Sequence, residues 1–442
     1  MSLSKLLLMS LRSPYIDDEK IYPPLGILYL KSAVEQKGIE VDITDDYDLS
    51  KPESFYPYNW IGLSVMTPQR EEAMNVLNTI KKHYPWKKVI IGGPHAKHYL
   101  SDVMKQPFDF IVPHDGQRSL VKILTGKAER VEIDKMNKTD WANQPRPDRI
   151  SDKAREFLST YHYTLQGRKA GTILTATGCP EQCSFCEEAM TAVRWSSIDN
   201  LKREMDDMLS LGYKGAYLFD DLFAIAMPTI TPILKELKSR DLIFRCNGQA
   251  RYFTKWGEDF AKLLSENGCK EIAFGHETGS QKILDNIRKR TTTQQNYDSI
   301  KFAKKYGINV KSFILLGLPG EDWTSLRETE RFIQTAGMDD FQCAIYYPYK
   351  GTQIRDAIDK LDKTGNRQSL DLQIIGEGLG AYGQKGGSTE AVVRTEALSQ
   401  QELLQFRDYL VDTYKPKSHQ EHWKDKSRDI HLVSQSEYWE QA

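Results

Sequence analysis

Three cysteines fall within eight positions of the chain. Cys179, Cys183 and Cys186 form the run CPEQCSFC, a CxxxCxxC spacing. Three thiolates on one short loop can converge on a single soft metal centre. A structural zinc site usually has four ligands in two pairs, and no fourth cysteine or histidine lies near the run. Three ligands to a four-iron cluster would leave one iron open to another group. The spacing favours an iron–sulfur site, and the alternatives are a zinc site or a loop of unligated cysteines.

The cysteine run follows a predicted strand at 172–176 and begins a long alternation of strands and helices. Further strands are expected at 215–219, 244–247, 271–274, 310–316 and 343–346, with helices between them that include 200–211 and 295–306. Six strand–helix units over roughly 180 residues are typical of a partial TIM-like barrel. In such barrels the chemistry takes place at the carboxyl ends of the strands, where the cysteine run lies.

The first 130 residues show a similar alternation with shorter helices. Strands are expected at 5–9, 39–43, 60–65, 89–92 and 110–112, and helices at 24–38, at 69–83 and from residue 117. This pattern predicts a doubly wound, Rossmann-like parallel sheet. Ligands of such sheets bind beyond the carboxyl ends of the strands, which here are 64–67, 92–95 and 113–116. These segments carry glycine, proline and small residues, which let a ligand approach the backbone.

The predicted fold class is therefore α/β, with two main domains. A Rossmann-like sheet domain (1–130) precedes a polar linker (131–165), which is expected to lie over the surface. A partial (β/α)6 TIM-like barrel (166–360) follows. The last part, 361–442, is a small C-terminal helical segment with a glycine-rich stretch at 376–388, a helix at 399–414 and a polar tail that contains Trp423 and Trp439.

Composition excludes several classes of protein. The chain has 442 residues with 60 basic and 61 acidic side chains, so no global field attracts nucleic acid or an anionic membrane. No apolar run approaches the roughly 18 residues of a spanning helix, and the first apolar run is too short for a secretory signal. Six cysteines are too sparse for a disulfide framework, which favours a reduced, cytoplasmic location. Cys246, Cys269 and Cys343 are expected to be small core residues.

The cysteine run resembles the signature of the radical S-adenosylmethionine (SAM) enzymes. The resemblance implies that Cys179, Cys183 and Cys186 hold a [4Fe–4S] cluster, whose open iron chelates the amine and carboxylate of SAM. Phe185 matches the family's aromatic position near the adenine. It also implies that one electron from the reduced cluster breaks the C5′–S bond of SAM and forms a 5′-deoxyadenosyl radical.

Later segments match the family in the order of the barrel strands. In FDDLF, the resemblance makes Asp220 and Asp221 candidates for the methionine amine, since carboxylates accept hydrogen bonds from an ammonium. Arg251, after the third strand, could pair with the methionine carboxylate as a fork donor.

The fourth to sixth strand ends extend this match. In GHETGS, Glu277 and Ser280 would contact the ribose or the amine, although Ser280 could instead cap the following helix. In LLGLPGE, Gly317 would let the backbone pack beside the adenine. The segment YPYKGT at 347–352 matches the sixth strand end.

Residues 21–130 resemble the cobalamin (B12)-binding domain found ahead of the barrel in one subgroup of this family. The matching segments are YPPLGILYL (22–30), IGLSV (61–65) and IIGGPH (90–95). The residues expected to contact cobalamin are Ser64, Thr67, Gly93, His95, His114 and Gly116.

Two features depart from the cobalamin-binding pattern. The DxHxxG motif, whose histidine lies below cobalt, is absent from the loop LRSPYIDDEK, as in many members of the subgroup. The last strand is followed by VPHDGQ rather than a Gly/Glu-rich turn. The alternative is a retained fold that binds substrate or a partner. His95, His98 and His114 have no metal-ligand spacing and are expected to be exposed or hydrogen-bonded.

The resemblance implies a cobalamin-dependent radical SAM enzyme, most commonly a methyltransferase acting on an unactivated carbon or phosphorus centre. The alternatives are a cobalamin-independent oxidoreductase, lyase or mutase, and a non-enzymatic metal-binding module. The expected partners are a small-molecule or peptide substrate and an electron donor such as flavodoxin or ferredoxin, with neither membrane nor nucleic acid involved. The stretch 376–388 is a candidate lid, because its glycines permit movement.

Overall fold

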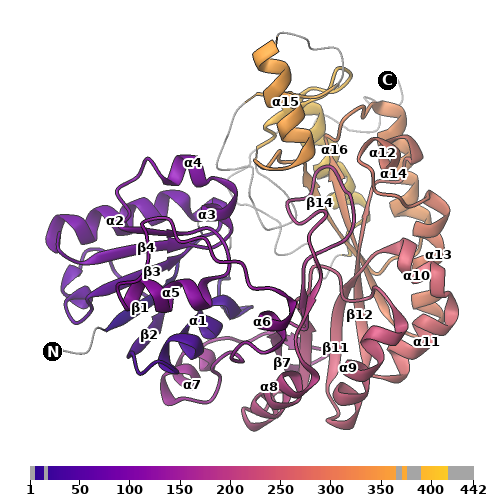
Figure 1. Ribbon diagram of the computed structural model, residues 1–442. Helices are drawn as coiled ribbons and strands as arrows, with labels where there is room; N and C mark the ends of the chain where they lie inside the picture. The colour runs from indigo at the N-terminus through magenta and orange to yellow at the C-terminus, as the bar shows by residue number, and fades with distance from the viewer. Residues whose placement is uncertain (1–4, 14–17, 365–370, 376–389, 417–442) are drawn as a thin grey trace. The chain divides into compact units, whose positions relative to one another are not determined.

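The computed structural model describes residues 5–13, 18–364, 371–375 and 390–416 (Figure 1). The candidate lid at 376–388 and the tail tryptophans, Trp423 and Trp439, lie outside the described residues. The chain divides into two compact units. The first comprises Met1–Glu181, Glu187–Asn247 and Lys262–Glu271, and the second comprises Gln182–Cys186, Gly248–Ala261 and Ile272–Ala442.

The N-terminal sheet has five parallel strands in the order β2-β1-β3-β4-β5. They are β1 (Leu6–Ser10), β2 (Val41–Thr44), β3 (Trp60–Ser64), β4 (Lys88–Gly92) and β5 (Phe110–Val112). The chain order reverses between β1 and β3, which is the position where open α/β sheets bind ligands at the carboxyl edge. The predicted doubly wound sheet is confirmed, and each expected strand lies within two residues of its predicted bounds.

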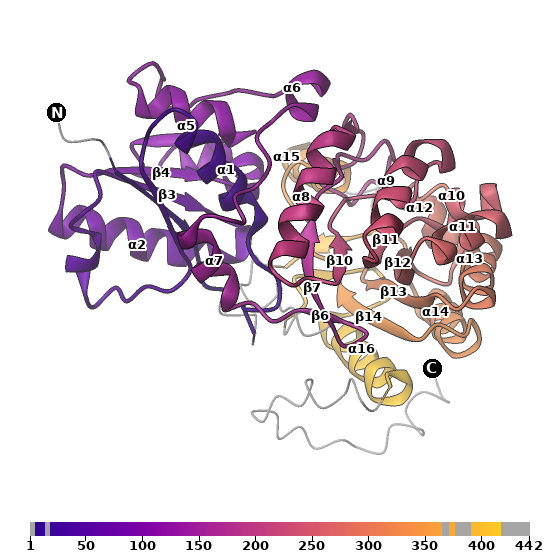
Figure 2. The ribbon, with the colours of Figure 1, turned by 90° about the horizontal axis from the view of Figure 1, so that it is seen from below.

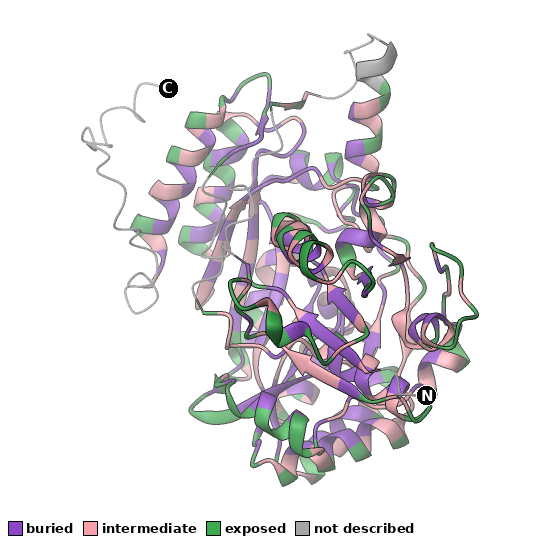
Figure 3. Cartoon of the chain, turned by 90° about the vertical axis from the view of Figure 1, so that its left-hand side faces the viewer, coloured by how far each residue is buried: buried purple, intermediate pink, exposed green. Residues whose placement is uncertain are grey.

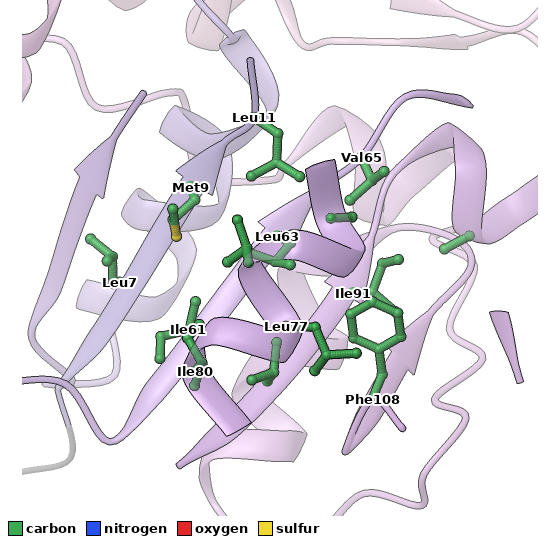
Figure 4. Close-up of a cluster of buried hydrophobic side chains, with 14 of the residues drawn as sticks. Leu7, Met9, Leu11, Ile61, Leu63, Val65, Leu77, Ile80, Ile91 and Phe108 are labelled. Carbon is green, nitrogen blue, oxygen red and sulfur yellow. The ribbon is translucent and has the colours of Figure 1, made fainter. Parts of the chain in front are cut away.

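Helices cover both faces of this sheet. In Figure 2, α1 (Leu25–Glu35) and α5 (Gly116–Leu124) lie on one side of β3 and β4, and α2 (Arg70–His83) lies on the other. Successive strand residues point to opposite faces, so each strand contributes to two cores. Figure 4 shows the core on the α2 side, where Leu7 and Met9 pack with Ile61 and Leu63.

The segment expected to be a surface linker contains two short helices, α6 (Lys138–Ala142) and α7 (Asp152–Ser159). Its polar residues include the N-caps of these helices, Asn137 and Ser151, and several of its apolar residues are buried, although Ile133 and Ile150 are exposed. Phe157, Leu158 and Tyr161 join the core beneath α1 and α5. The segment therefore contributes to the core of the first unit, because α7 has apolar side chains on one face.

The second large sheet has seven strands in the order β14-β13-β12-β11-β10-β7-β6. Its members are β6 (Thr164–Leu165), β7 (Arg168–Ile173), β10 (Gly215–Leu218), β11 (Ile243–Gly248), β12 (Cys269–Glu277), β13 (Asn309–Leu316) and β14 (Asp340–Ile345). β6 pairs antiparallel with β7 at the edge. The other six strands correspond to the six predicted ones, which confirms the partial TIM-like barrel.

Helices separate these strands along the chain, as Figure 1 shows. The helices of this region are α8 (Ile198–Ser210), α9 (Met227–Ser239), α10 (Ala250–Trp256), α11 (Glu258–Glu266), α12 (Gln281–Asn286), α13 (Thr293–Lys305) and α14 (Trp323–Thr335). A two-stranded ribbon of β8 (Ala176–Thr177) and β9 (Arg194–Trp195) flanks the cysteine run. The strands are largely buried, whereas many helices show alternating buried and exposed stripes (Figure 3).

The described C-terminal elements are α15 (Gln353–Thr364), β15 (Gln373–Ile374), β16 (Val393–Arg394) and α16 (Gln400–Tyr414). The helix expected at 399–414 is confirmed as α16, and the Ser399 side chain caps it by accepting a hydrogen bond from the Glu402 N–H. None of the described helices is both long enough and apolar enough to cross a membrane.

Candidate functional site

The cysteine run forms a loop that turns back on itself after β7. Gly178 has φ +91°, and a Cβ there would lie 2.4 Å from the carbonyl oxygen of Ala192, so only glycine fits. The Cys179 N–H donates to Thr191 Oγ1 at 2.8 Å, and the Thr191 N–H donates to the Cys179 carbonyl at 2.9 Å. These bonds join the two ends of the loop and fix the backbone of its first cysteine.

The cysteines of the chain fall into two groups. Cys183 is buried, and Cys179 and Cys186 are half-buried. Cys246, Cys269 and Cys343 are buried in strands, as expected. Burial raises the pKa of Cys343 to about 12, so this thiol stays protonated and unreactive. The loop thiols lie close together in sequence and two of them are partly exposed, and three such donors suit an iron–sulfur cluster.

The two aspartates after β10 have different surroundings. Asp220 is buried and accepts hydrogen bonds from the N–H of Thr175, at 2.7 Å, and from its hydroxyl. Burial raises the pKa of Asp220 to about 7. Asp221 is exposed, and its carboxylate accepts from the Gly178 N–H at 2.7 Å. Asp220 therefore holds the turn after β7, and Asp221 lies against the first residue of the cysteine loop. The contact of either with SAM stays a prediction.

In the second unit, Glu277 forms an ion pair with Lys289, a residue that no sequence motif singled out. The Lys289 ammonium lies 2.6 Å from Glu277 Oε1, and both side chains are buried. The same ammonium lies 5.8 Å from the centre of the Phe185 ring. A Cβ at Gly275 would lie 2.4 Å from Glu277 Oε1 and 2.9 Å from Lys289 Nζ, so a side chain there would displace this pair. No sequence pattern marks Lys289, because it lies twelve positions from its partner in an unpredicted turn.

Ser280 and Arg251 begin helices in this unit. Ser280 is the N-cap residue of α12, but its side chain makes no capping bond. Its buried hydroxyl has no hydrogen-bond partner among the described residues. A buried hydroxyl without a partner is unfavourable, so this group is suited to a ligand. Arg251 lies in the first turn of α10, with its guanidinium 4.9 Å from the Tyr252 ring centre.

The glycine segment after β13 is tightly packed. Gly317 has φ +82°, and a Cβ there would lie 3.0 Å from Val393 and 3.2 Å from Leu403. The carboxylate of Glu321 accepts a hydrogen bond from the Gly317 N–H, and burial raises the pKa of Glu321 to about 8. A buried carboxyl therefore holds this segment in place, and its approach to adenine stays a prediction.

Backbone groups form the carboxyl edge of the N-terminal sheet. Gly93 has φ +92°, and a Cβ there would lie 2.8 Å from both the nitrogen and the oxygen of Val65. The Val65 N–H donates to the Gly92 carbonyl at 2.9 Å, and the His95 N–H donates to the Val65 carbonyl at 3.0 Å. Backbone hydrogen bonds therefore hold the ends of β3 and β4 together, and no side chain fits between them. A large flat ligand can approach the backbone closely at such an edge.

The topology brings the six predicted cobalamin-contacting residues to this edge. Ser64 ends β3, Gly93 and His95 follow β4, and the other three residues are Thr67, His114 and Gly116. His95 is buried and stacked on Tyr99, with ring centres 5.0 Å apart. Burial lowers the pKa of His114, and it lowers that of His98 to about 4, so both rings are neutral at pH 7. Small residues and neutral rings fit an uncharged macrocycle face, although no contact with cobalamin is tested.

Two family descriptions match the chain in the same order as its two sheets. The "B12 binding domain" matches residues 17–124, and the "Radical SAM superfamily" matches residues 173–333. The first range includes β2 to β5 of the N-terminal sheet but not β1, and the second begins at the last residue of β7 and includes the cysteine loop.

Individual relatives and a solved structure match most of the chain. An uncharacterized methyltransferase of Pyrococcus horikoshii is 27% identical over 75% of this chain and 77% of its own length. An anaerobic magnesium-protoporphyrin IX monomethyl ester cyclase of Rubrivivax gelatinosus is 23% identical over 74% of this chain and 65% of its own. The structure of the radical SAM methyltransferase TsrM of Kitasatospora setae superposes with a TM-score of 0.67 at 16% identity, and the match covers 85% of this chain and 81% of that one.

These matches agree with the predicted domain order and cofactors. The radical SAM domain implies a [4Fe–4S] cluster and SAM, and the B12-binding domain implies cobalamin. The thiol loop and the backbone-formed sheet edge suit the cluster and the corrinoid respectively. The chain is a radical SAM enzyme of the subgroup that has a B12-binding domain ahead of the barrel.

Proposed function

We propose that this enzyme transfers a methyl group from SAM to an unactivated carbon or phosphorus centre of a small molecule or peptide, with the help of cobalamin. The proposal rests on two features of one chain. One is the loop with three cysteines, and the other is the sheet edge where the backbone of Gly93 packs directly against Val65. The P. horikoshii relative and the Kitasatospora protein, both named methyltransferases, support the reaction class.

When bound, the cofactors supply reductive cleavage of a sulfonium bond and carriage of a methyl group. The residues of the chain bind and orient them. We assign cluster ligation to Cys179, Cys183 and Cys186, with Asp221 positioned for the methionine ammonium. Ser280 would give its unpartnered buried hydroxyl to a polar group of SAM. The chain would also exclude water from the site once the cofactors are bound, which protects reactive species.

At the sheet edge, the chain would bind cobalamin through backbone and small side chains. Ser64 and Thr67 can donate hydrogen bonds to amide oxygens of the corrin rim, and Gly93 lets the ring approach the backbone. We expect no protein ligand below cobalt, since the loop after β1 has no DxHxxG motif.

A second candidate is oxidative cyclisation without methyl transfer. The similarity to the R. gelatinosus cyclase favours it, since that relative matches over almost the same share of this chain. Both candidates use the cysteine loop. They differ in whether SAM loses its methyl group.

The test is anaerobic reconstitution with iron, sulfide and hydroxocobalamin, followed by metal analysis and reaction with methyl-labelled SAM and a flavodoxin-type reductant. We expect four irons and one cobalt per chain. We also expect S-adenosylhomocysteine, which SAM becomes when it gives up its methyl group. Retention of cobalt together with this product supports methyl transfer.

Four irons without retained cobalt, with 5′-deoxyadenosine as the sole SAM product, would move the assignment to cobalamin-independent chemistry. A Gly93→Ala variant is the matched control, because it alters the sheet edge and leaves the cysteine loop unchanged. It should retain less cobalt and form less S-adenosylhomocysteine than the wild type while keeping its iron. The electron donor is tested in the same assay by exchanging flavodoxin for ferredoxin.

A further inference from the structure

Lys289 is the buried cation of the second unit that lies beside the cysteine loop. It is 7% exposed, and its ammonium reaches both the Glu277 carboxylate, at 2.6 Å, and the face of the Phe185 ring, at 5.8 Å from the centre. Phe185 lies between two of the loop cysteines in sequence. A positive charge is rarely buried without a specific partner or purpose, and here the Glu277 carboxylate is one such partner.

The backbone around Lys289 is held in a strained turn. Arg288 and Arg290, on either side of it, have φ values of +54° and +57°, which side chains rarely adopt. The Lys289 N–H donates to the Leu284 carbonyl at 2.9 Å, and its own carbonyl accepts from Gln249 Nε2 at 3.2 Å. Glu277 is also left-handed, with φ +64°. Such strain persists where surrounding structure fixes a functional position.

The charge of Lys289 acts on the loop thiols. Burial lowers the pKa of Lys289, but the Glu277 carboxylate, 2.6 Å away, outweighs this effect and keeps the ammonium charged at neutral pH. The ammonium also interacts electrostatically with Cys183 and Cys186. The same attraction stabilises any added negative charge at these sulfurs. One-electron reduction of a cluster bound by these thiols adds one such charge.

We propose that Lys289 is a positioning residue that holds Glu277 and raises the reduction potential of the cluster by placing a fixed positive charge beside Cys183 and Cys186. The proposal rests on the cluster and not on methyl transfer. Glu277 opposes the effect, since its negative charge destabilises the reduced state, so the two residues of the pair should act with opposite signs.

The experiment is an anaerobic redox titration of the reconstituted enzyme without SAM, cobalamin or substrate, followed by electron paramagnetic resonance of the reduced cluster. The variants are Lys289→Met, Lys289→Arg and Glu277→Gln. Lys282→Met is the matched control, because Lys282 lies on the preceding helix and its side chain is 55% exposed. At the potential where half of the wild-type cluster is reduced, Lys289→Met should lower the reduced-to-oxidised ratio about tenfold.

Glu277→Gln should raise this ratio, and Lys289→Arg should restore it toward the wild-type value, while the control stays unchanged. A Lys289→Met potential equal to that of the wild type would overturn the proposal. If this variant assembles no cluster, Glu277→Gln decides, since an upward shift supports the proposal and no shift contradicts it. Failure of the wild-type protein to assemble a cluster would instead contradict the assigned cofactor, which keeps the two conclusions separate.

Discussion

The two regions assigned to cofactor binding present different chemical groups, backbone in the N-terminal sheet and side chains at the barrel strand ends. The carboxyl edge of the N-terminal sheet is closed by backbone, where Gly93 packs against Val65 and leaves no space for a side chain. The barrel strand ends instead present thiols, carboxylates and a buried lysine. A large neutral macrocycle can be held by shape and many weak contacts, whereas an iron–sulfur cluster needs specific donor atoms. Substitutions should therefore act differently in the two regions.

The largest effect is expected at a cluster ligand. Cys183→Ala should abolish both the cluster and reductive cleavage of SAM, because two thiolates cannot hold it. The measurement is iron content together with 5′-deoxyadenosine formation. Circular dichroism should show that the chain still folds. Cys343→Ala, a buried cysteine in β14, is the control and should keep its iron. Retained SAM cleavage in Cys183→Ala would refute the assignment of the loop.

A methyl group added to the backbone-formed edge should have the next largest effect. Gly93→Ala forces an unfavourable φ and brings a Cβ to 2.8 Å from Val65, so we expect about tenfold weaker cobalamin binding, measured by equilibrium dialysis. Gly126→Ala shares a positive φ of +71° but has open space, so it separates strain from close approach. Equal losses of cobalamin affinity in both variants would show that the unfavourable φ, and not the close approach to Val65, causes the weaker binding.

The third prediction concerns Glu321, whose buried carboxyl group accepts a hydrogen bond from the Gly317 N–H in the segment after β13. Its pKa is raised to about 8 in the folded state, so the unfolded chain releases a proton that the folded chain keeps. The wild type should therefore lose stability as pH rises toward 8. Glu321→Gln should remove this loss, on the order of 2 kcal/mol between pH 6 and 8.

Unfolding by urea at the two pH values measures this difference for the wild type and the variant. The exposed Glu328→Gln on α14 is the control and should keep the wild-type pH dependence. A Glu321→Gln variant with the same pH dependence as the wild type would show that the carboxyl ionises freely in the folded protein.

The smallest effect is expected from a side chain at the sheet edge. His114→Ala should weaken cobalamin binding only about twofold, because its neutral ring offers at most one weak contact. The same dialysis measures it. A loss as large as that of Gly93→Ala would mean that side chains, and not backbone, hold the corrinoid, and the contrast between the two regions would fail.

The sequence by itself determined the order and type of the main elements. Apolar residues recur every two positions in strands and every three to four in helices because of backbone geometry. The five strands of the first sheet and the six barrel strands could therefore be predicted. It also determined the cysteine loop, because the ligands of the cluster lie within eight positions. Local spacing is sufficient where the interacting residues are neighbours in the chain.

Only the tertiary structure decided which distant residues meet. The turn that brings Lys289 to Glu277 contains two arginines with positive φ, and no residue pattern predicts it. Segment 131–165 has a polar composition but buries Arg149, which pairs with Glu204 at 2.7 Å. Gly93 has no neighbour in sequence that reveals its contact with Val65. Such contacts depend on how strands and turns pack, and packing brings together residues whose separation along the chain carries no periodic signal.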